Sequence, residues 1–450
     1  MKKIFTRNFV VAIFICLGTF LIYRAGFFST DEKVVSQENK NKNENQVEAE
    51  KKVNSPSGSW NVDSSEDYRA LGYSGQRKVV ADGQGGFYLA YRKKFNGRYQ
   101  IFVAHAKLSG SKYFFEYVDR PISAVEAGDD QRVPSLAIDA DGVLHAVWYG
   151  IDAGRPTNER QVKYSRSSDQ GETWTDWKNI APVTGFRFSD EYWQEHPVIT
   201  AAAGKLWVVW EGRDAENIKQ QIKMIVSYDG GENWSPWKNI KVIPTNTQSR
   251  PVLLTQDGRN LHLLMYSSWG NVANLQQIQH SYSTDGGENW SEWLNISDPE
   301  KDSRHLSACF TGTGRLYVVW RSFDPLANKS RLESAYLIGR SWRNPQPVAE
   351  SGQNQFFPSI SCSQEDDSFS LAWMESTEVS LLPREEPSTG VVMLSKFDGQ
   401  NFSSPQKINS GNDGHYPNLA ESFDKNQPLP IFFGEKRTNE INQLKFSLVE

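Results

Sequence analysis

Cysteine is nearly absent from this 450-residue chain, which has only Cys16, Cys309 and Cys362. Three cysteines are too few for a disulfide framework of the kind found in small secreted domains. No cysteine or histidine cluster has the spacing of zinc ligands either. The sequence therefore predicts no metal site and no cofactor.

A strong charge of either sign is also missing. The chain has 49 Lys and Arg against 54 Asp and Glu, which gives a formal net charge of −5. Nucleic-acid binding domains usually carry a marked basic excess, so we expect no nucleic-acid partner. The 38% of hydrophobic and 12% of aromatic residues supply ample material for a core and exclude a wholly disordered chain.

Long apolar runs are limited to one, at residues 9–28. As a helix this run would be about 30 Å long, enough to cross a bilayer. Lys2, Lys3 and Arg7 precede it, so residues 1–8 are predicted to be a cytoplasmic stub. No small-x-small cleavage site follows, which favours an uncleaved signal anchor; a cleaved signal, and hence a secreted protein, is the alternative.

A polar stretch at residues 29–58 follows, rich in Lys, Glu, Asn and Gln. It cannot bury enough apolar surface to offset its ordering entropy. We expect a disordered linker that joins the membrane helix to a folded part at residues 59–450, on the extracytoplasmic side.

Three octets in that folded part are near copies with the pattern S-x-D-x-G-x-x-W. They begin at Ser167, Ser227 and Ser283, and their Asp residues are 60 and 56 positions apart. Asp bonds readily to nearby backbone, Gly allows a left-handed backbone, and Trp can cover the turn. Because the octet recurs, we interpret it as a structural hairpin turn rather than a catalytic site. Its key residues are Asp169, Gly171, Trp174, Asp229, Gly231, Trp234, Asp285, Gly287 and Trp290.

A second repeat begins with a basic or aromatic residue, often followed by Pro, and continues into a strongly apolar strand. The stretch from Leu206 to Trp210 is one such strand. We count seven copies, each with about four short strands. Runs this apolar imply burial on both faces, so neighbouring sheets must stack.

Closing that stack into a ring protects the sheet edges, so we predict an all-β fold, a β-propeller with seven blades; six blades remain the alternative. The last repeat has only three strands before Glu450, and Ser59 to Val62 could supply the fourth. Cys309 and Cys362 fall in consecutive repeats, and we expect them to be free buried thiols.

The octet is the Asp-box, and the array at about residues 76–450 resembles the sialidase (neuraminidase) superfamily of Asp-box (BNR repeat) propellers. The resemblance implies a substrate clamp of three arginines, a nucleophilic Tyr paired with a Glu, and a loop Asp as acid/base. Guanidinium groups suit a carboxylate because they bind it bidentately. Sialidases are the exception among glycosidases in using a Tyr nucleophile.

Residue by residue, the match is partial. Arg132, before Val133 and Pro134, resembles the first clamp arginine, and Arg331 lies near the place of the second. The segment around Tyr416 resembles the one that bears the nucleophile. Asp152 can stand in for the loop acid, and Glu211 is a distant candidate for the Glu that activates Tyr416. No residue matches the third arginine, so the catalytic set is incomplete and enzymatic activity is an open question.

The residues that open each repeat should converge at one end of the propeller axis. They would form a basic funnel that attracts an anion. The candidates for substrate binding there are Arg77, Arg132, Arg250, Arg304 and His196, beside Arg331. Our first hypothesis is a protein that recognises, and in an active form hydrolyses, an acidic glycan. A membrane-tethered scaffold that binds a protein partner is the alternative, and a propeller polysaccharide lyase is the third.

Overall fold

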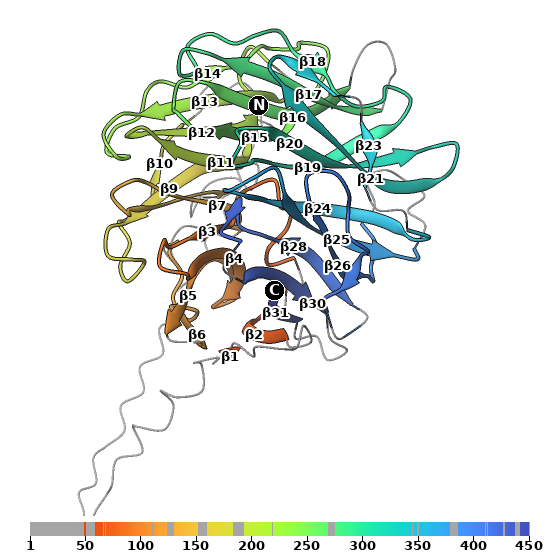
Figure 1. Cartoon of the computed structure of the whole chain (residues 1–450). Coiled ribbons are helices and arrows are strands. Elements are labelled where there is room, and N and C mark those ends of the chain that lie inside the picture. The colour runs from red at the N-terminus through yellow and green to blue at the C-terminus, as the bar shows by residue number, and fades with distance from the viewer. Residues whose placement is uncertain are drawn as a thin grey trace, which may run out of the picture. The chain divides into compact units, whose positions relative to one another are not determined.

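The computed structural model shows seven antiparallel sheets arranged around a common centre (Figure 1). It describes residues 49–50, 59–65, 67, 69–109, 112–123, 130–151, 160–182, 193–217, 219–268, 275–343, 345–348, 351–378, 386–409, 411, 413–425, 428–436 and 442–449. The predicted β-propeller with seven blades is confirmed, and six blades are excluded. We number the blades 1 to 7 in chain order of their inner strands.

Each blade has an inner strand next to the axis, and Figure 1 shows these strands around the centre. The inner strands are β3 (Val79–Ala81), β7 (Arg132–Ile138), β11 (Gln194–Ala202), β15 (Ser249–Thr255), β19 (Asp302–Phe310), β24 (Asn354–Ser363) and β28 (Gly414–Asn418). The second strands are β4 (Phe87–Phe95), β8 (Leu144–Gly150), β12 (Lys205–Gly212), β16 (Leu261–Ser268), β20 (Leu316–Asp324), β25 (Phe369–Ser376) and β30 (Leu429–Glu435).

The third and outer strands complete each sheet toward the periphery. The third strands are β5 (Arg98–Ser109), β9 (Gln161–Ser167), β13 (Gln221–Ser227), β17 (Gln276–Ser283), β21 (Lys329–Ile338), β26 (Val391–Phe397) and β31 (Asn442–Val449). The outer strands are β6 (Lys112–Glu116), β10 (Lys178–Asn179), β14 (Lys238–Asn239), β18 (Leu294–Asn295), β22 (Ser341–Trp342) with β23 (Gln346–Pro347), β27 (Gln406–Lys407) and β2 (Ser59–Ser65). Two short strands extend sheets: β1 (Ala49–Glu50) pairs with β6, and β29 (Ser422–Phe423) pairs in parallel with β24.

The ring closes through β2, as the sequence predicted. This strand comes from the start of the folded part and pairs antiparallel with β31 near the end of the chain, with Trp60 opposite Phe446. Blade 7 is thus built from both ends of the propeller. The pairing covers one edge of β2 and one edge of β31 that would otherwise be free.

The core lies between blades rather than inside a single sheet. One apolar cluster joins Val147 and Tyr164 of blade 2 to Ile199 and Trp210 of blade 3. The second strand β12 is buried at every residue after Lys205 because both of its faces pack on neighbouring blades. This explains why the second strands have nearly continuous apolar sequences.

The Asp-box turns join third strands to outer strands. Asp229 Oδ1 accepts hydrogen bonds from Ser227 Oγ (2.8 Å) and from the Asn233 backbone N–H (2.9 Å). Gly231 has a φ of +89°, and a Cβ there would lie 1.9 Å from the Tyr164 hydroxyl oxygen, so only glycine fits. Hydrogen bonds from Asn233 and Ser227 lower the pKa of Asp229 to about 2. The pKa values of the other two Asp-box carboxylates are also lowered to about 2, through the equivalent bonds; these are Asp169 and Asp285.

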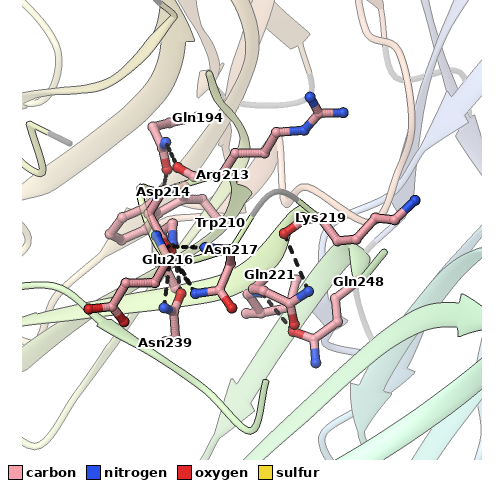
Figure 2. A network of polar contacts seen from close by, with 12 residues as sticks. Gln194, Trp210, Arg213, Asp214, Glu216, Asn217, Lys219, Gln221, Asn239 and Gln248 are labelled. Carbon is pink, nitrogen blue, oxygen red and sulfur yellow. Dashed lines mark hydrogen bonds and ion pairs between the residues drawn. The ribbon is translucent and has the colours of Figure 1, made fainter. Parts of the chain in front are cut away.

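A polar network recurs inside blades 2 and 3. In blade 3 the Trp210 indole N–H donates to Gln194 Oε1 (2.7 Å), and Gln194 Nε2 donates to the Arg213 carbonyl (2.8 Å) (Figure 2). In blade 2 the Trp148 indole N–H donates to Gln131 Oε1 at 2.8 Å. The recurrence shows that this network belongs to the fold.

The two repeat cysteines correct one prediction. Cys309 on β19 and Cys362 on β24 form a disulfide, with their Cα atoms 5.8 Å apart, so the prediction of free thiols is wrong. The inner strands of neighbouring blades approach each other at the axis, and this brings the two side chains within bonding distance. Consecutive repeats are neighbours in the ring, so their inner strands β19 and β24 are close enough for a bond.

The N-terminal predictions fall mostly outside the described residues. The stub at residues 1–8, the apolar run at 9–28 and nearly all of the linker at 29–58 are not described; Ala49–Glu50 forms β1. Within the described part of the chain, no helix is long and apolar enough to span a membrane.

Candidate functional site at the propeller axis

Six of the inner strands carry the same backbone irregularity near their start. The register against the second strand shifts there, as in β11 between Glu195 and Val198. One residue of each bulge has a positive φ of 47–53°. A non-glycine residue held in this conformation is strained, and such strain concentrates at functional sites. The six residues are Val133, His196, Arg250, His305, Phe357 and Tyr416.

The bulges set the register of the predicted basic funnel. Arg250, His196 and Tyr416, which the sequence places at the opening of their repeats, are bulge residues. Arg132 and Arg304 lie one residue before the bulge, so their side chains differ in position from Arg250. The sequence missed this offset because a basic residue at either of two adjacent positions fits the same repeat pattern.

Tyr416 pairs with a carboxylate at the axis. Its hydroxyl donates to Glu386 Oε2, and the hydroxyl of Tyr73 donates to Glu386 Oε1. Arg69 Nη2 lies 3.2 Å from Glu386 Oε2. Burial and the charge of Glu386 raise the pKa of Tyr416 well above its ordinary value, so the hydroxyl keeps its proton at neutral pH. A phenol beside a carboxylate is the arrangement that an activated oxygen nucleophile or base requires.

Arg250 is a partly exposed cation of the ring. Its guanidinium carbon lies 4.3 Å from the centre of the Tyr73 ring, a cation–π contact. Burial disfavours the charged guanidinium, but the nearby Tyr266, Tyr73 and Glu211 outweigh this effect and raise the pKa of Arg250 above its ordinary value. The guanidinium therefore stays charged. Its Nη1 is buried and has no hydrogen-bond partner among the described residues. A buried donor without a partner is costly, and an anionic ligand would satisfy it.

His196 and Glu211 form a buried pair beside Arg250. His196 Nδ1 and Glu211 Oε1 are 2.6 Å apart, and the Arg250 backbone N–H donates to Glu211 Oε2. Burial raises the pKa of Glu211 to about 7, although Arg250 opposes this shift. Burial and Arg250 hold the pKa of His196 well below its usual range. Glu211 contacts His196 and Arg250, and the carboxylate at the Tyr416 hydroxyl is Glu386, so the pairing of Glu211 with Tyr416 is corrected.

Glu195, His196 and Glu211 are one described set whose donor atoms could hold a metal ion, since these atoms lie within 4.8 Å of one another. Each already has a protein partner: Glu195 binds Arg160, and Glu211 binds His196 and the Arg250 backbone. Positive groups this close disfavour a further cation. The set is therefore best explained as an ion pair, Arg160–Glu195, beside the hydrogen-bonded pair of His196 and Glu211.

Several predicted arginines are already paired. Arg77 binds Glu421 and Arg132 binds Asp130. Arg304 donates to both oxygens of Asp302 and lies 5.8 Å from the Tyr266 ring, which places it beside Arg250. Arg331 is an exposed residue of β21, opposite Ser322. Asp152 lies outside the described residues.

Two residues of the site escaped the sequence analysis. Glu386 lies in the segment before β26, and Tyr73 lies ahead of β3, so neither belongs to a recognisable repeat position. Glu386 is the second of two adjacent glutamates before Pro387, and this short acidic pair carries no spacing signal. A search for non-repeating acids in connections that follow a second strand would have included Glu386.

Comparisons with known proteins agree with this fold. The model of the BNR repeat-like domain family matches residues 118–425. No curated protein matches the sequence. Among solved structures, an ulvan lyase from a new family of polysaccharide lyases has 12% identity and a TM-score of 0.58, covering 85% of this chain and 93% of its own.

The polysaccharide lyase Uly1 is similar as well, with 10% identity and a TM-score of 0.52 over 83% of this chain and 90% of its own. At such low identity these likenesses show the fold alone. The family match covers most of the chain and agrees with the Asp-box repeats. The chain therefore belongs to the family of BNR repeat-like domains.

Proposed function

We propose that the propeller binds an acidic glycan at its axis and acts on it there. The observation that carries this proposal is the partly exposed Arg250, which has a buried donor without a partner and lies beside the Tyr416–Glu386–Tyr73 cluster. Arg304 adds a second guanidinium near the same place. A sugar carboxylate or sulfate is the anion that this arrangement would accept.

Hydrolysis of the sialidase type is the reaction that the cluster supports first. It needs a phenol whose proton a carboxylate can accept. Glu386 supplies this carboxylate, which the repeat pattern of the sequence did not reveal. The phenol oxygen would form a bond to the anomeric carbon while the bond to the leaving sugar oxygen breaks. The phenol proton would pass to Glu386, and the leaving oxygen would take a proton from water. The hydroxide left by that water would then displace the phenol oxygen from the sugar carbon, and the phenol would regain its proton from Glu386.

Elimination is the second candidate, because it needs a guanidinium beside a phenol. The guanidinium carbon of Arg250 lies 4.3 Å from the centre of the Tyr73 ring. Arg250 would neutralise a uronate carboxylate. The Tyr73 oxygen would take the proton from the adjacent carbon as its own proton moves to Glu386, the bond to the leaving sugar oxygen would break as the double bond forms, and the leaving oxygen would take the proton from Glu386. Two of the similar structures are named as polysaccharide lyases, which agrees with this chemistry. The described contacts offer no comparable support for a scaffold that binds a protein partner.

We also propose that the propeller acts outside the cytoplasm. Disulfides persist in oxidising compartments, and the Cys309–Cys362 bond fits the location that the apolar run at residues 9–28 implies. Anchoring by that run remains part of this proposal.

The purified full-length chain should be tested against a fluorogenic sialoside and against uronate-containing polysaccharides, each beside Tyr416→Phe. Release of the fluorophore indicates hydrolysis, and ultraviolet absorbance of an unsaturated uronate indicates elimination. Calorimetric titration with acidic and neutral oligosaccharides measures binding without turnover. A protein that neither binds nor cleaves any acidic glycan would overturn the proposal.

A further inference from the structure

The connection at residues 69–78 fills the centre of the ring. It leads from the outer strand β2 of blade 7 to the inner strand β3 of blade 1. A Cβ on Gly75 would lie 2.9 Å from the Leu306 carbonyl of blade 5 and 3.4 Å from Val252 Cγ2 of blade 4. Ser74 Oγ donates to the Pro358 carbonyl of blade 6. A segment that touches three blades across the ring must cross the axis.

Tyr73 is the residue that this segment places among the bulges. Its ring stacks on His305, with centroids 4.8 Å apart and an interplanar angle of 17°. The Phe357 and Tyr416 rings lie 5.8 and 6.2 Å away. The guanidinium carbon of Arg250 lies 4.3 Å from its centroid. Four bulge residues from four different blades therefore surround one tyrosine.

The two tyrosines that share Glu386 differ in exposure. Tyr416 is only 2% exposed, belongs to an apolar core cluster and has the Phe357 ring 4.7 Å away. Tyr73 is partly exposed and packs against that cluster without being one of its buried members. Both phenols donate to the same carboxylate, one to each oxygen. A ligand that arrives at the axis would thus meet Tyr73 before Tyr416.

We propose that Tyr73 is the catalytic phenol of the site and that Tyr416 is a positioning residue that acts through Glu386. This inference rests on the proposed function and assigns its reacting group. With the anionic group of the substrate on Arg250, the Tyr73 oxygen attacks the anomeric carbon as its proton moves to Glu386 Oε1. The glycosidic bond breaks, and the leaving oxygen takes a proton from water. The hydroxide so formed displaces the Tyr73 oxygen from the sugar carbon, and Tyr73 regains its proton from Glu386. Tyr416 and Arg69 hold the other oxygen of Glu386 in place.

The first test compares Tyr73→Phe with Tyr416→Phe in the full-length chain, on the acidic glycan that the wild type cleaves. We expect Tyr73→Phe to lower kcat by about 100-fold to 10,000-fold, as for loss of a proton-transfer group. We expect Tyr416→Phe to lower kcat by about 10-fold, as for loss of an orienting partner. Tyr113→Phe is the matched control, because its hydroxyl donates to the Gly85 carbonyl in blade 1 and lies outside the site.

The split between kcat and KM separates positioning from a merely structural role. Tyr416→Phe removes the hydrogen bond that holds Glu386 in place beside the Tyr73 hydroxyl, but it leaves Arg250 free to bind the anionic group of the substrate. We therefore expect kcat to fall while KM stays unchanged in this variant. A structural role, in which loss of Tyr416 disturbs the whole site, would raise KM as well.

Hydroxyl-radical footprinting adds a readout that does not depend on turnover. We expect oxidation at Tyr73 and protection at Tyr416, and a saturating acidic oligosaccharide should protect Tyr73. Wild-type turnover that survives Tyr73→Phe, or a Tyr73 that radicals do not reach, would overturn this inference while the proposed function stands. A wild type that neither binds nor cleaves any acidic glycan would overturn both.

Discussion

The rim and the axis of this propeller use repetition in opposite ways. Blades 2 and 3 repeat both backbone and side chains: Lys163 and Lys223 each donate to an Asn of the outer strand, at 3.0 and 2.6 Å. At the axis, six blades repeat the positive-φ bulge, but the side chain changes from Val133 to Tyr416. Repeated side chains serve the fold, whereas a repeated backbone with varied side chains builds a site. This difference can be tested at both places.

Among the changes that test this difference, a change at Arg250 has the largest expected effect, because Arg250 is the one arginine among the six described bulge residues. Arg250→Lys keeps a positive charge but loses the planar fork that binds a carboxylate bidentately. We expect affinity for an acidic oligosaccharide to fall by about 100-fold or more, as for truncation of one partner of a buried charge pair. Calorimetric titration measures this, with Arg343→Lys, an exposed arginine, as the control. Unchanged affinity in Arg250→Lys would remove the axis from the binding site.

The disulfide should dominate stability. It joins residues 53 positions apart in neighbouring inner strands. Closing a loop of that length in the unfolded chain stabilises the fold by about 4 kcal/mol in the chain-entropy model. Cys309→Ala with Cys362→Ala should lower the free energy of unfolding by about that amount in urea titrations. The same loss should appear when the wild type is unfolded in reductant, and equal stability with and without reductant would contradict the bond.

The fold was far more predictable from the sequence than the site. Apolar second strands recur in every copy and glycine-bearing turns in most of them, so the seven blades and the closing strand β2 followed from pattern alone. Tyr73 and Glu386 come from connections that occur once, and their meeting depends on the ring being closed. The Cys309–Cys362 bond likewise depends on how close two inner strands lie. Periodicity carries no information on either.

Two buried lysines test whether the rim is truly repetitive. Lys223 is fully buried and donates to Asp214 and Asn239. In Figure 2, Asp214 also binds Asn217 and Asn239. Lys223→Met should lower the free energy of unfolding by about 3 kcal/mol, because it leaves the carboxylate of Asp214 buried without its cation. Adding Asp214→Asn should recover part of that loss.

The same change in blade 2 addresses the candidate acid Asp152. This residue follows Gly150 by two positions, as Asp214 follows Gly212. Lys163→Met should cost as much as Lys223→Met if Asp152 has the structural role of Asp214. A much smaller cost, measured by the same urea titration, would leave Asp152 as a loop acid and would weaken the claim that these blades are equivalent.

The smallest effect concerns two carboxylates only three residues apart, one facing the axis and one facing the rim. Burial raises the pKa of Glu211 to about 7, whereas Lys223 lowers the pKa of Asp214 despite burial. The stability from Glu211 is fully present below pH 4.5, its unfolded value, and is lost as pH rises through about 7. The stability from Asp214 is present above pH 3.8 and is lost as pH falls below it. Glu211→Gln should therefore flatten the decline in unfolding free energy between pH 4.5 and 7. Asp214→Asn should leave that decline intact. A decline that persists in Glu211→Gln and disappears in Asp214→Asn would contradict the assignment of this pH dependence to Glu211.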